Sequence, residues 1–122
     1  MSPSGDLGRF MADYRAMTSE TPRWNERIWD DRQVCTDVER DDHEGTIYLG
    51  AIYSDARRGG NASAVLRALC ELADRHGITL QLTPVRLSRR GLTKRALVAW
   101  YSRHGFAPTS KYSMRRLPRS TA

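Results

Sequence analysis

The stretch "ARRGGNAS" (residues 56–63) joins an apolar run, "TIYLGAIYS" (46–54), to a second apolar run, "NASAVLRALCELADRHG" (61–77). The first run is rich in β-branched and aromatic residues, which is typical of a β-strand. The second repeats its apolar residues at helical spacing, and Gly77 is a helix-stop residue at its end. This order of strand, glycine-rich turn and helix decides the fold class.

The residues that follow extend the same pattern. "ITLQLTP" (78–84) alternates apolar and polar residues, which predicts a strand. Thr93 is a suitable cap for a helix over "KRALVAWYSRHG" (94–105), and "SKYSMRRLP" (110–118) predicts a last strand. A strand, a helix and another strand imply a parallel crossover with its helix against a sheet, so we expect an α/β layered fold.

The residues before position 46 predict two helices and a strand. Apolar residues in 7–17 lie on one helical face, and "RWNERIWDDRQV" (23–34) predicts a short second helix after Thr21-Pro22. Residues 34–40 read as a strand, which an acidic turn at 41–45 connects to the strand over 46–54. At 122 residues the chain has the size of one domain, so we treat residues 1–122 as a single domain.

Charge divides the chain unevenly. Residues 1–45 contain six Arg and eleven acids, a formal charge of −5, whereas residues 46–122 contain fourteen Lys and Arg and three acids, a charge of +11. A basic part suits a polyphosphate ligand or nucleic acid, and an acidic part suits a cationic partner. Two cysteines without a metal-type spacing, no export signal and no apolar run of membrane length favour a cytoplasmic protein without metal or membrane association.

The loop at 56–63 has the features of an anion site. The first backbone N–H groups of a helix lack partners within the helix, and the helix dipole places partial positive charge there. Gly59 and Gly60 allow the backbone to approach a ligand closely, and Arg57 and Arg58 add positive charge. The loop therefore suits a pyrophosphate, although glycine pairs are equally common in ordinary turns.

The wider pattern resembles a known family. Residues 57–62 read R-x-x-G-x-A between a strand and an amphipathic helix, and Tyr101, Gly105 and Phe106 form a later Tyr-x-x-x-Gly-Phe sequence. In this order the features resemble the GNAT family of acyl-CoA-dependent N-acyltransferases, over roughly residues 46–117. The resemblance implies an acyl-CoA N-acyltransferase-like fold: a mixed, mostly antiparallel sheet with a central parallel β-α-β crossover, flanked by helices.

The resemblance also implies a function and a site. The chain would be an acetyl-CoA-dependent N-acetyltransferase in which a primary amine attacks the thioester directly. Tyr101 would protonate the departing thiolate; the alternative is that it only fills the core. Acetyl-CoA would be bound by a strand segment, the loop with the first turn of the next helix, and one lysine: Ala51, Ile52, Tyr53, Arg57, Arg58, Gly59, Gly60, Asn61, Ala62, Ser63 and Lys94.

The sequence departs from the family pattern in three ways. Lys94 stands where the family often has asparagine, and it is equally interpreted as a contact to the 3′-phosphate or as part of a solvated basic face. The strand over 46–54 has no acid to serve as general base, and His43, Glu44 and Asp55 are better explained as turn residues. Residues 1–45, the acceptor-side part, are short for the family, so one or two of its usual first strands are expected to be missing.

Two other classes of function stay open. A GNAT-like protein without catalytic activity would bind acyl-CoA or a protein partner, and a homodimer is compatible with either reading. A basic nucleic-acid-binding protein is the third reading, but the basic residues are spread over a loop, a helix and a strand without a recognised motif. For the leading reading, the charge of residues 1–45 suggests a cationic amine acceptor, whose identity the sequence does not reveal.

Overall fold

The computed structural model describes residues 6–54, 61–85 and 92–119. Within these residues the chain is an α+β protein with three helices and a mixed sheet of seven strands. The helices are α1 (Leu7–Met17), α2 (Asn61–His76) and α3 (Lys94–Arg103). The strands are β1 (Ser19–Glu20), β2 (Glu26–Trp29), β3 (Val34–Asp41), β4 (Thr46–Ser54), β5 (Thr79–Leu82), β6 (Ala107–Pro108) and β7 (Met114–Arg116).

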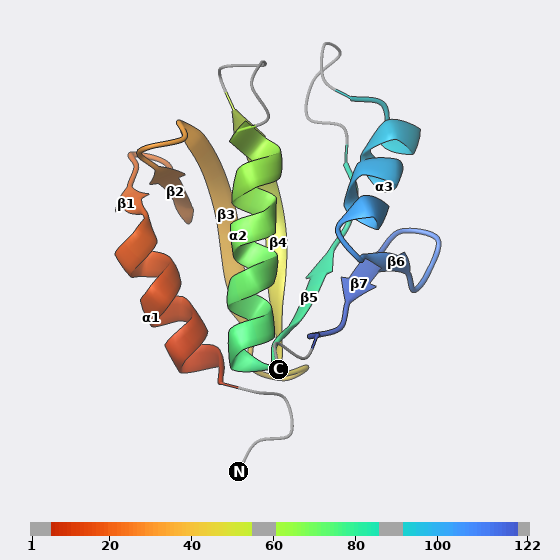
Figure 1. The fold of residues 1–122 in the computed structure, drawn as a ribbon, viewed down its shortest axis with the longest axis horizontal. Helices are drawn as coiled ribbons and strands as arrows, with labels where there is room; N and C mark the ends of the chain where they lie inside the picture. Colours follow the sequence, from red (N-terminus) through yellow and green to blue (C-terminus); the bar gives the residue numbers. More distant parts are fainter. Residues whose placement is uncertain (1–5, 55–60, 86–91, 120–122) are drawn as a thin grey trace.

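The sheet has the spatial order β1-β2-β3-β4-β5-β7-β6 (Figure 1). Among the described strands only β4 and β5 pair in parallel, and α2 makes the crossover between them. The expected mixed, mostly antiparallel sheet with a central parallel crossover is therefore confirmed. The register of β3 and β4 shifts between Asp37 and Val38, which marks a β-bulge opposite Gly50.

All three helices lie on one face of the sheet (Figure 1). α2 lies over β3 and β4, and α1 packs beside it, with a 2.7 Å hydrogen bond between the Asp13 and His76 side chains. α3 is tied to α2 by a hydrogen bond from Trp100 Nε1 to Ser63 Oγ, 2.9 Å long. The other face of the sheet is covered by none of these helices.

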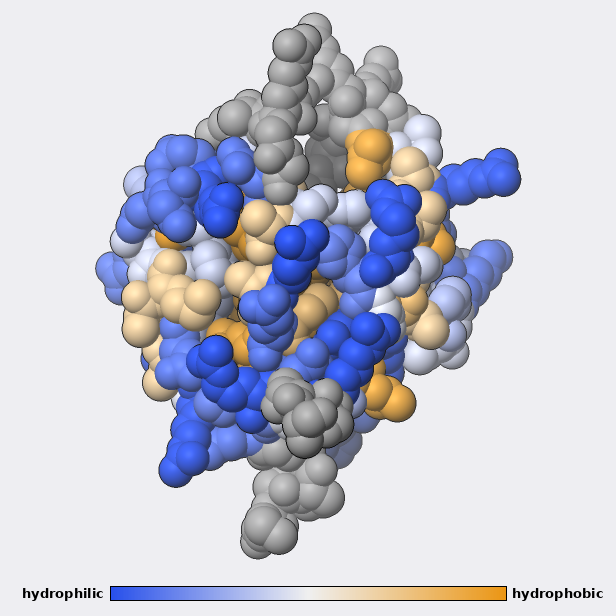
Figure 2. Space-filling view, viewed as in Figure 1, coloured by the Kyte–Doolittle hydropathy of each residue, from blue (hydrophilic) through white to orange (hydrophobic). Residues whose placement is uncertain are grey.

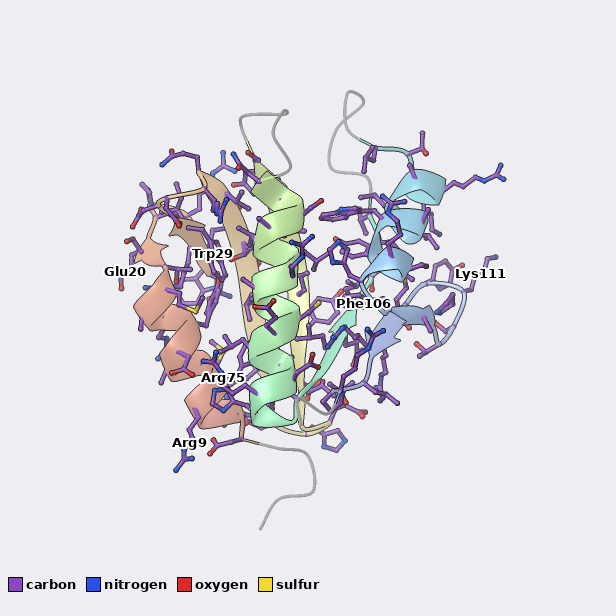
Figure 3. The ribbon with its side chains drawn as sticks, in the orientation of Figure 1. Arg9, Glu20, Trp29, Arg75, Phe106 and Lys111 are labelled. Atoms are coloured by element: carbon purple, nitrogen blue, oxygen red, sulfur yellow. The ribbon has the colours of Figure 1, made fainter. Side chains whose placement is uncertain are left out.

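The core fills the space between the helices and the sheet. Figure 3 shows Trp29 between α1 and the sheet, and Phe106 between α2 and the end of α3. Figure 2 shows that hydrophilic side chains cover most of the outer surface on this side, with apolar residues exposed between them. Apolar side chains from every layer form one cluster, including Phe10, Leu66, Leu69, Ile47, Leu80, Tyr101 and Met114.

Most elements expected from the sequence are present at the expected places. The helices over 7–17, 61–76 and 94–103 are confirmed, and Thr93 caps α3 by accepting a hydrogen bond from the Ala96 N–H. The strands over 34–41, 46–54, 79–82 and 114–116 are also confirmed. Gly77 ends α2 with a φ of +67°, a left-handed conformation that suits glycine.

The predicted helix over residues 23–34 is wrong. This segment forms β2 and the turn into β3, and Asn25 and Gln33 have positive φ angles of 63° and 54°, which an α-helix does not permit. Trp24 is 88% exposed, whereas Trp29 is buried opposite Val34 of β3. The apolar residues of this segment thus follow a strand and its turn, and the N-terminal part contributes three strands to the sheet.

Candidate functional site

β4 and β5 separate at one end of the sheet. They pair from Thr46 with Thr79 to Leu49 with Leu82, where β5 ends, while β4 continues to Ser54. On the β5 side of residues 50–53 the described part of the chain therefore has no neighbouring strand, and Figure 1 shows the two strands diverging there. An unpaired strand edge presents main-chain N–H and C=O groups that can pair with a peptide-like ligand.

The N-terminus of α2 lies at the same end of the sheet (Figure 1). Asn61, Ala62 and Ser63 form its first turn and are half-buried, so three of the predicted binding residues lie beside the opening. The predicted residues 57–60 lie outside the described part of the chain. The basic residues at the other end, Arg75 and His76, complement the helix dipole at its negative end.

Tyr101 of α3 is enclosed by aromatic rings. Its ring centroid is 4.9 Å from that of Trp100 and 5.5 Å from that of Phe106, and 7% of the residue is exposed. Burial raises the pKa of Tyr101 to about 12, so its hydroxyl keeps its proton at neutral pH. No hydrogen-bond partner of this hydroxyl is found among the described residues. The hydroxyl can therefore donate its proton to a ligand, and the same arrangement also fits a residue that only fills the core.

The predicted strand segment divides its side chains between the two faces. Ile52 is buried on the helix-covered face, whereas Ala51 and Tyr53 lie on the other face, opposite Asp37 and Cys35 of β3. The Tyr53 hydroxyl donates to Glu26 at 2.6 Å, and this bond together with burial raises the pKa of Tyr53. The segment can therefore contact a ligand as a unit only through its main-chain edge.

Lys94 is exposed at the first position of α3. Its ammonium lies 5.7 Å from the ring centroid of Tyr112, which also attracts Lys111 at 5.5 Å. These contacts direct Lys94 toward the β6–β7 connection, and no described contact joins it to the first turn of α2. Its place is compatible with a solvated basic position as well as with a distant phosphate contact.

Three carboxylates on the helix-free face were not identified from the sequence. Glu26 of β2 lies directly opposite Asp37 of β3, and Glu39 follows two positions later on the same face; we call these three residues the acidic trio. Glu26 bonds to Tyr53, and Glu39 accepts from the Asn25 side chain at 3.2 Å. The sequence pattern that could have identified two of them is the alternation of Thr36 and Val38 with polar residues, because in a strand it places positions 35, 37 and 39 on the same face.

Asp37 differs from the other two members of the trio. Its Oδ1 atom is buried and has no hydrogen-bond partner among the described residues. Burial and the nearby charges of Glu39 and Glu26 raise the pKa of Asp37. A Cβ built on Gly50 would lie 3.2 Å from the Asp37 Cγ atom, so the carboxylate occupies the space over that glycine.

A separate hollow lies at the β1–β2 edge of the sheet. It has a volume of about 620 Å³ and is lined by α1, the β1–β2 connection and the end of β3, including Tyr14, Trp24, Glu26 and Glu39. Its described lining includes none of the residues predicted to bind acetyl-CoA. The described residues contain no group of three or more His, Cys, Asp or Glu side chains placed to hold a metal ion, and no described helix is long and apolar enough to span a membrane.

Comparisons with known proteins yield a similarity of fold. Neither the family models nor the curated protein sequences gave a match. Among solved structures, the anti-CRISPR protein AcrVA5 is similar, with a TM-score of 0.52 over 81% of this chain and 95% of that chain, at 16% sequence identity. At this identity the likeness establishes a shared fold and nothing about chemistry.

Proposed function

We propose that this protein is a compact GNAT-like N-acetyltransferase that transfers the acetyl group of acetyl-CoA to a primary amine. The observation that carries the proposal is the separation of β4 from β5 beside the first turn of α2, with Tyr101 on the neighbouring helix α3. The spacing of residues 57–62 and of Tyr101, Gly105 and Phe106 supports the same assignment.

Two parts of acetyl-CoA have a chemically suitable region in this arrangement. The first turn of α2, with the loop before it, supplies N–H donors and positive charge for a pyrophosphate. The unpaired edge of residues 50–53 supplies main-chain donors and acceptors for the amide groups of the pantetheine arm. Acetyl-CoA itself supplies an activated carbonyl, which loses a thiolate when an amine attacks.

Tyr101 supplies the proton for that thiolate. A thiol has a pKa of about 8.5, so a phenol that is fully protonated at neutral pH can donate to a thiolate that develops beside it. Trp100 and Phe106 pack against the buried ring and fix its orientation. A fixed orientation of the hydroxyl favours proton transfer to the leaving group.

The first experiment is calorimetric titration with acetyl-CoA at two salt concentrations. We expect stoichiometric binding in the micromolar range and its loss in Gly60→Glu, which places a negative side chain in the loop. Unchanged affinity of that variant would overturn the loop assignment. Absence of binding in the wild-type protein would overturn the whole proposal, and a steeply salt-dependent affinity for DNA would then favour the nucleic-acid reading.

The catalytic assignment is tested with Tyr101→Phe. We expect turnover, measured as release of CoA thiol, to fall about 100-fold, a size typical of general acid catalysis. The affinity for acetyl-CoA and the unfolding temperature should stay nearly unchanged, because the described structure gives the hydroxyl no partner. Unchanged turnover would identify Tyr101 as a core residue, and acetyl-CoA binding without turnover in the wild-type protein would favour a non-catalytic acyl-CoA-binding protein.

A further inference from the structure

The helix-free face of the sheet meets the opening between β4 and β5 at Gly50. This residue is the first of β4 beyond the last pair with β5, and it lies at the bulge opposite Asp37 and Val38. Because glycine has no side chain, the Asp37 carboxylate can lie over it, with its Oδ2 atom 3.3 Å from where a Cβ would stand. One carboxylate from the neighbouring strand therefore reaches the border of the opening.

This carboxylate has no structural task among the described residues. The buried Oδ1 atom of Asp37 accepts no hydrogen bond from residues 6–54, 61–85 or 92–119, although buried acceptors in folded proteins almost always have a partner. Directly opposite it stands Glu26, a like charge that destabilises the strand pair. An unpartnered oxygen beside two negative neighbours is unfavourable for folding, which indicates that the position serves another purpose.

We propose that Asp37 is the general base of the acetyl transfer and that the acceptor amine approaches it from the helix-free face. This inference rests on the proposed function. The amine nitrogen forms a bond with the thioester carbonyl carbon, and the carbon–sulfur bond breaks with its electron pair on sulfur. Before this attack the ammonium form of the amine gives one proton to the Asp37 carboxylate, which passes it to solvent. After the attack the nitrogen loses its second proton to solvent, and the thiolate takes a proton from Tyr101, whose phenolate regains one from solvent.

The acidic trio also defines the class of acceptor. A primary alkylamine such as a lysine side chain has a pKa of about 10.4, so it arrives protonated at neutral pH and must lose a proton before it attacks. Glu26 and Glu39 add negative potential that concentrates a cation at this face. The raised pKa of Asp37 brings its basicity closer to neutral pH, which favours proton acceptance.

The test compares two acceptors of different basicity in Asp37→Asn. One is a capped peptide, Ala-Ala-Lys-Ala-Ala, which is protonated at neutral pH; the other is 4-methoxyaniline, which is uncharged and needs no prior deprotonation. We expect turnover of the peptide to fall about 100-fold, with no more than about a threefold change for the aromatic amine. An equal loss for both amines, or no loss for the peptide, would overturn the assignment.

Two further variants separate catalysis from folding. Glu71→Gln removes an exposed charge from α2, on the helix-covered side of the sheet, and should change turnover of the peptide by less than about threefold. Gly50→Ala keeps the Asp37 residue but adds a methyl group where its carboxylate lies, so the carboxylate must shift and turnover of the peptide should fall about tenfold. A Gly50→Ala variant as active as the wild type would contradict the proposed position of the base.

The pH profile provides an independent readout. In the wild type, turnover of the peptide should fall on the acidic side as Asp37 becomes protonated, and this limb should be absent in Asp37→Asn. The other ionisable groups facing Asp37 are retained in that variant: Arg23, Glu26, Cys35, Glu39, Tyr48 and Tyr53. A wild-type protein that binds acetyl-CoA but acetylates neither amine would overturn the role of Asp37 while leaving acetyl-CoA binding intact, whereas failure to bind acetyl-CoA would overturn both proposals.

Discussion

Asp37 and Asp74 are partly buried carboxylates on opposite sides of the same sheet, and their surroundings are opposite too. Arg116 donates to both oxygens of Asp74, at 2.8 and 3.0 Å, and the Arg119 backbone N–H donates a third bond. Burial acts to raise the pKa of Asp74, but these bonds and charges outweigh it and lower the pKa. The pKa of Asp37 is instead raised, by burial and by the nearby negative charges of Glu39 and Glu26.

The difference separates a structural carboxylate from a functional one. Arg116 also donates from Nε to the His104 carbonyl at the end of α3, so its pair with Asp74 joins α2, α3 and β7. On the helix-covered face polar groups are thus used to hold elements together. On the helix-free face the Oδ1 atom of Asp37 has no partner in the described part of the chain, and it lies next to the opening between β4 and β5, where a substrate can provide one.

The largest effect is expected from Arg116→Met. This change leaves the Asp74 carboxylate buried without its partner, so we expect the free energy of unfolding in urea to fall by about 3 kcal/mol. The matched control is Arg115→Met, one position away on the other face, where the side chain is 36% exposed and pairs with Glu44. That variant should lose only about 0.5 kcal/mol, and equal losses would remove the distinction between the two faces.

The same pair predicts a dependence on pH. The pKa of Asp74 is lowered in the folded protein, so the pair contributes fully above the unfolded pKa of about 3.9 and loses its contribution as pH falls through the folded pKa. The stability difference between the wild type and Arg116→Met should therefore shrink below about pH 4. A difference that stays constant down to pH 2 would show that packing, not charge, is responsible.

A smaller effect is expected from Thr36→Val. The buried Thr36 hydroxyl connects α1 with β2. It forms a hydrogen bond of 2.7 Å with the Tyr14 hydroxyl and accepts one of 3.1 Å from Trp29 Nε1. Valine keeps the volume but leaves both groups without this partner, at a cost of about 2 kcal/mol in urea unfolding. Thr36→Ser keeps the hydroxyl and loses one methyl group, so it should cost about 1 kcal/mol; the reverse order would contradict this account.

The helix-covered side was largely predictable from the sequence. Helical periodicity in residues 61–76, with Gly77 after it, locates α2, and the apolar alternation of residues 78–84 locates β5. The segment over 23–34 was not predictable in this way, because Ile28 and Trp29 are adjacent and fit a helix turn as well as a strand. What decides it is tertiary: Trp29 is buried only when paired with Val34 and bonded to Thr36.

The candidate site was predictable in part for a related reason. Local motifs indicate the first turn of α2 and Tyr101, since each motif lies within one element and its turn. Asp37 and Gly50 are thirteen positions apart and become neighbours only through the register of β3 and β4 with its bulge. From the sequence, a base was expected on or next to β4, which borders the opening. The carboxylate that lies there in the structure belongs to the adjacent strand, β3.

The smallest effect, and the one that most directly tests the comparison, is a gain of stability in Asp37→Asn. Removing a charge directly opposite Glu26 should raise the free energy of unfolding at pH 7 by about 0.5 kcal/mol. Because the pKa of Asp37 is raised in the folded protein, the wild type gains stability relative to the variant as pH falls through that pKa toward about 3.9. The advantage of the variant, measured by urea unfolding at several pH values, should therefore vanish near pH 4.

Glu39→Gln is the control for this gain, because Glu39 is exposed, bonds to Asn25 and has Tyr48, not an acid, opposite it. We expect its stability to differ from the wild type by less than that of Asp37→Asn. A variant that is more stable but slower identifies a residue kept for its chemistry at the expense of the fold. An Asp37→Asn variant less stable than the wild type would mean that the carboxylate holds the bulge of β4 in place, and Asp37 would then belong with Asp74 among the structural residues.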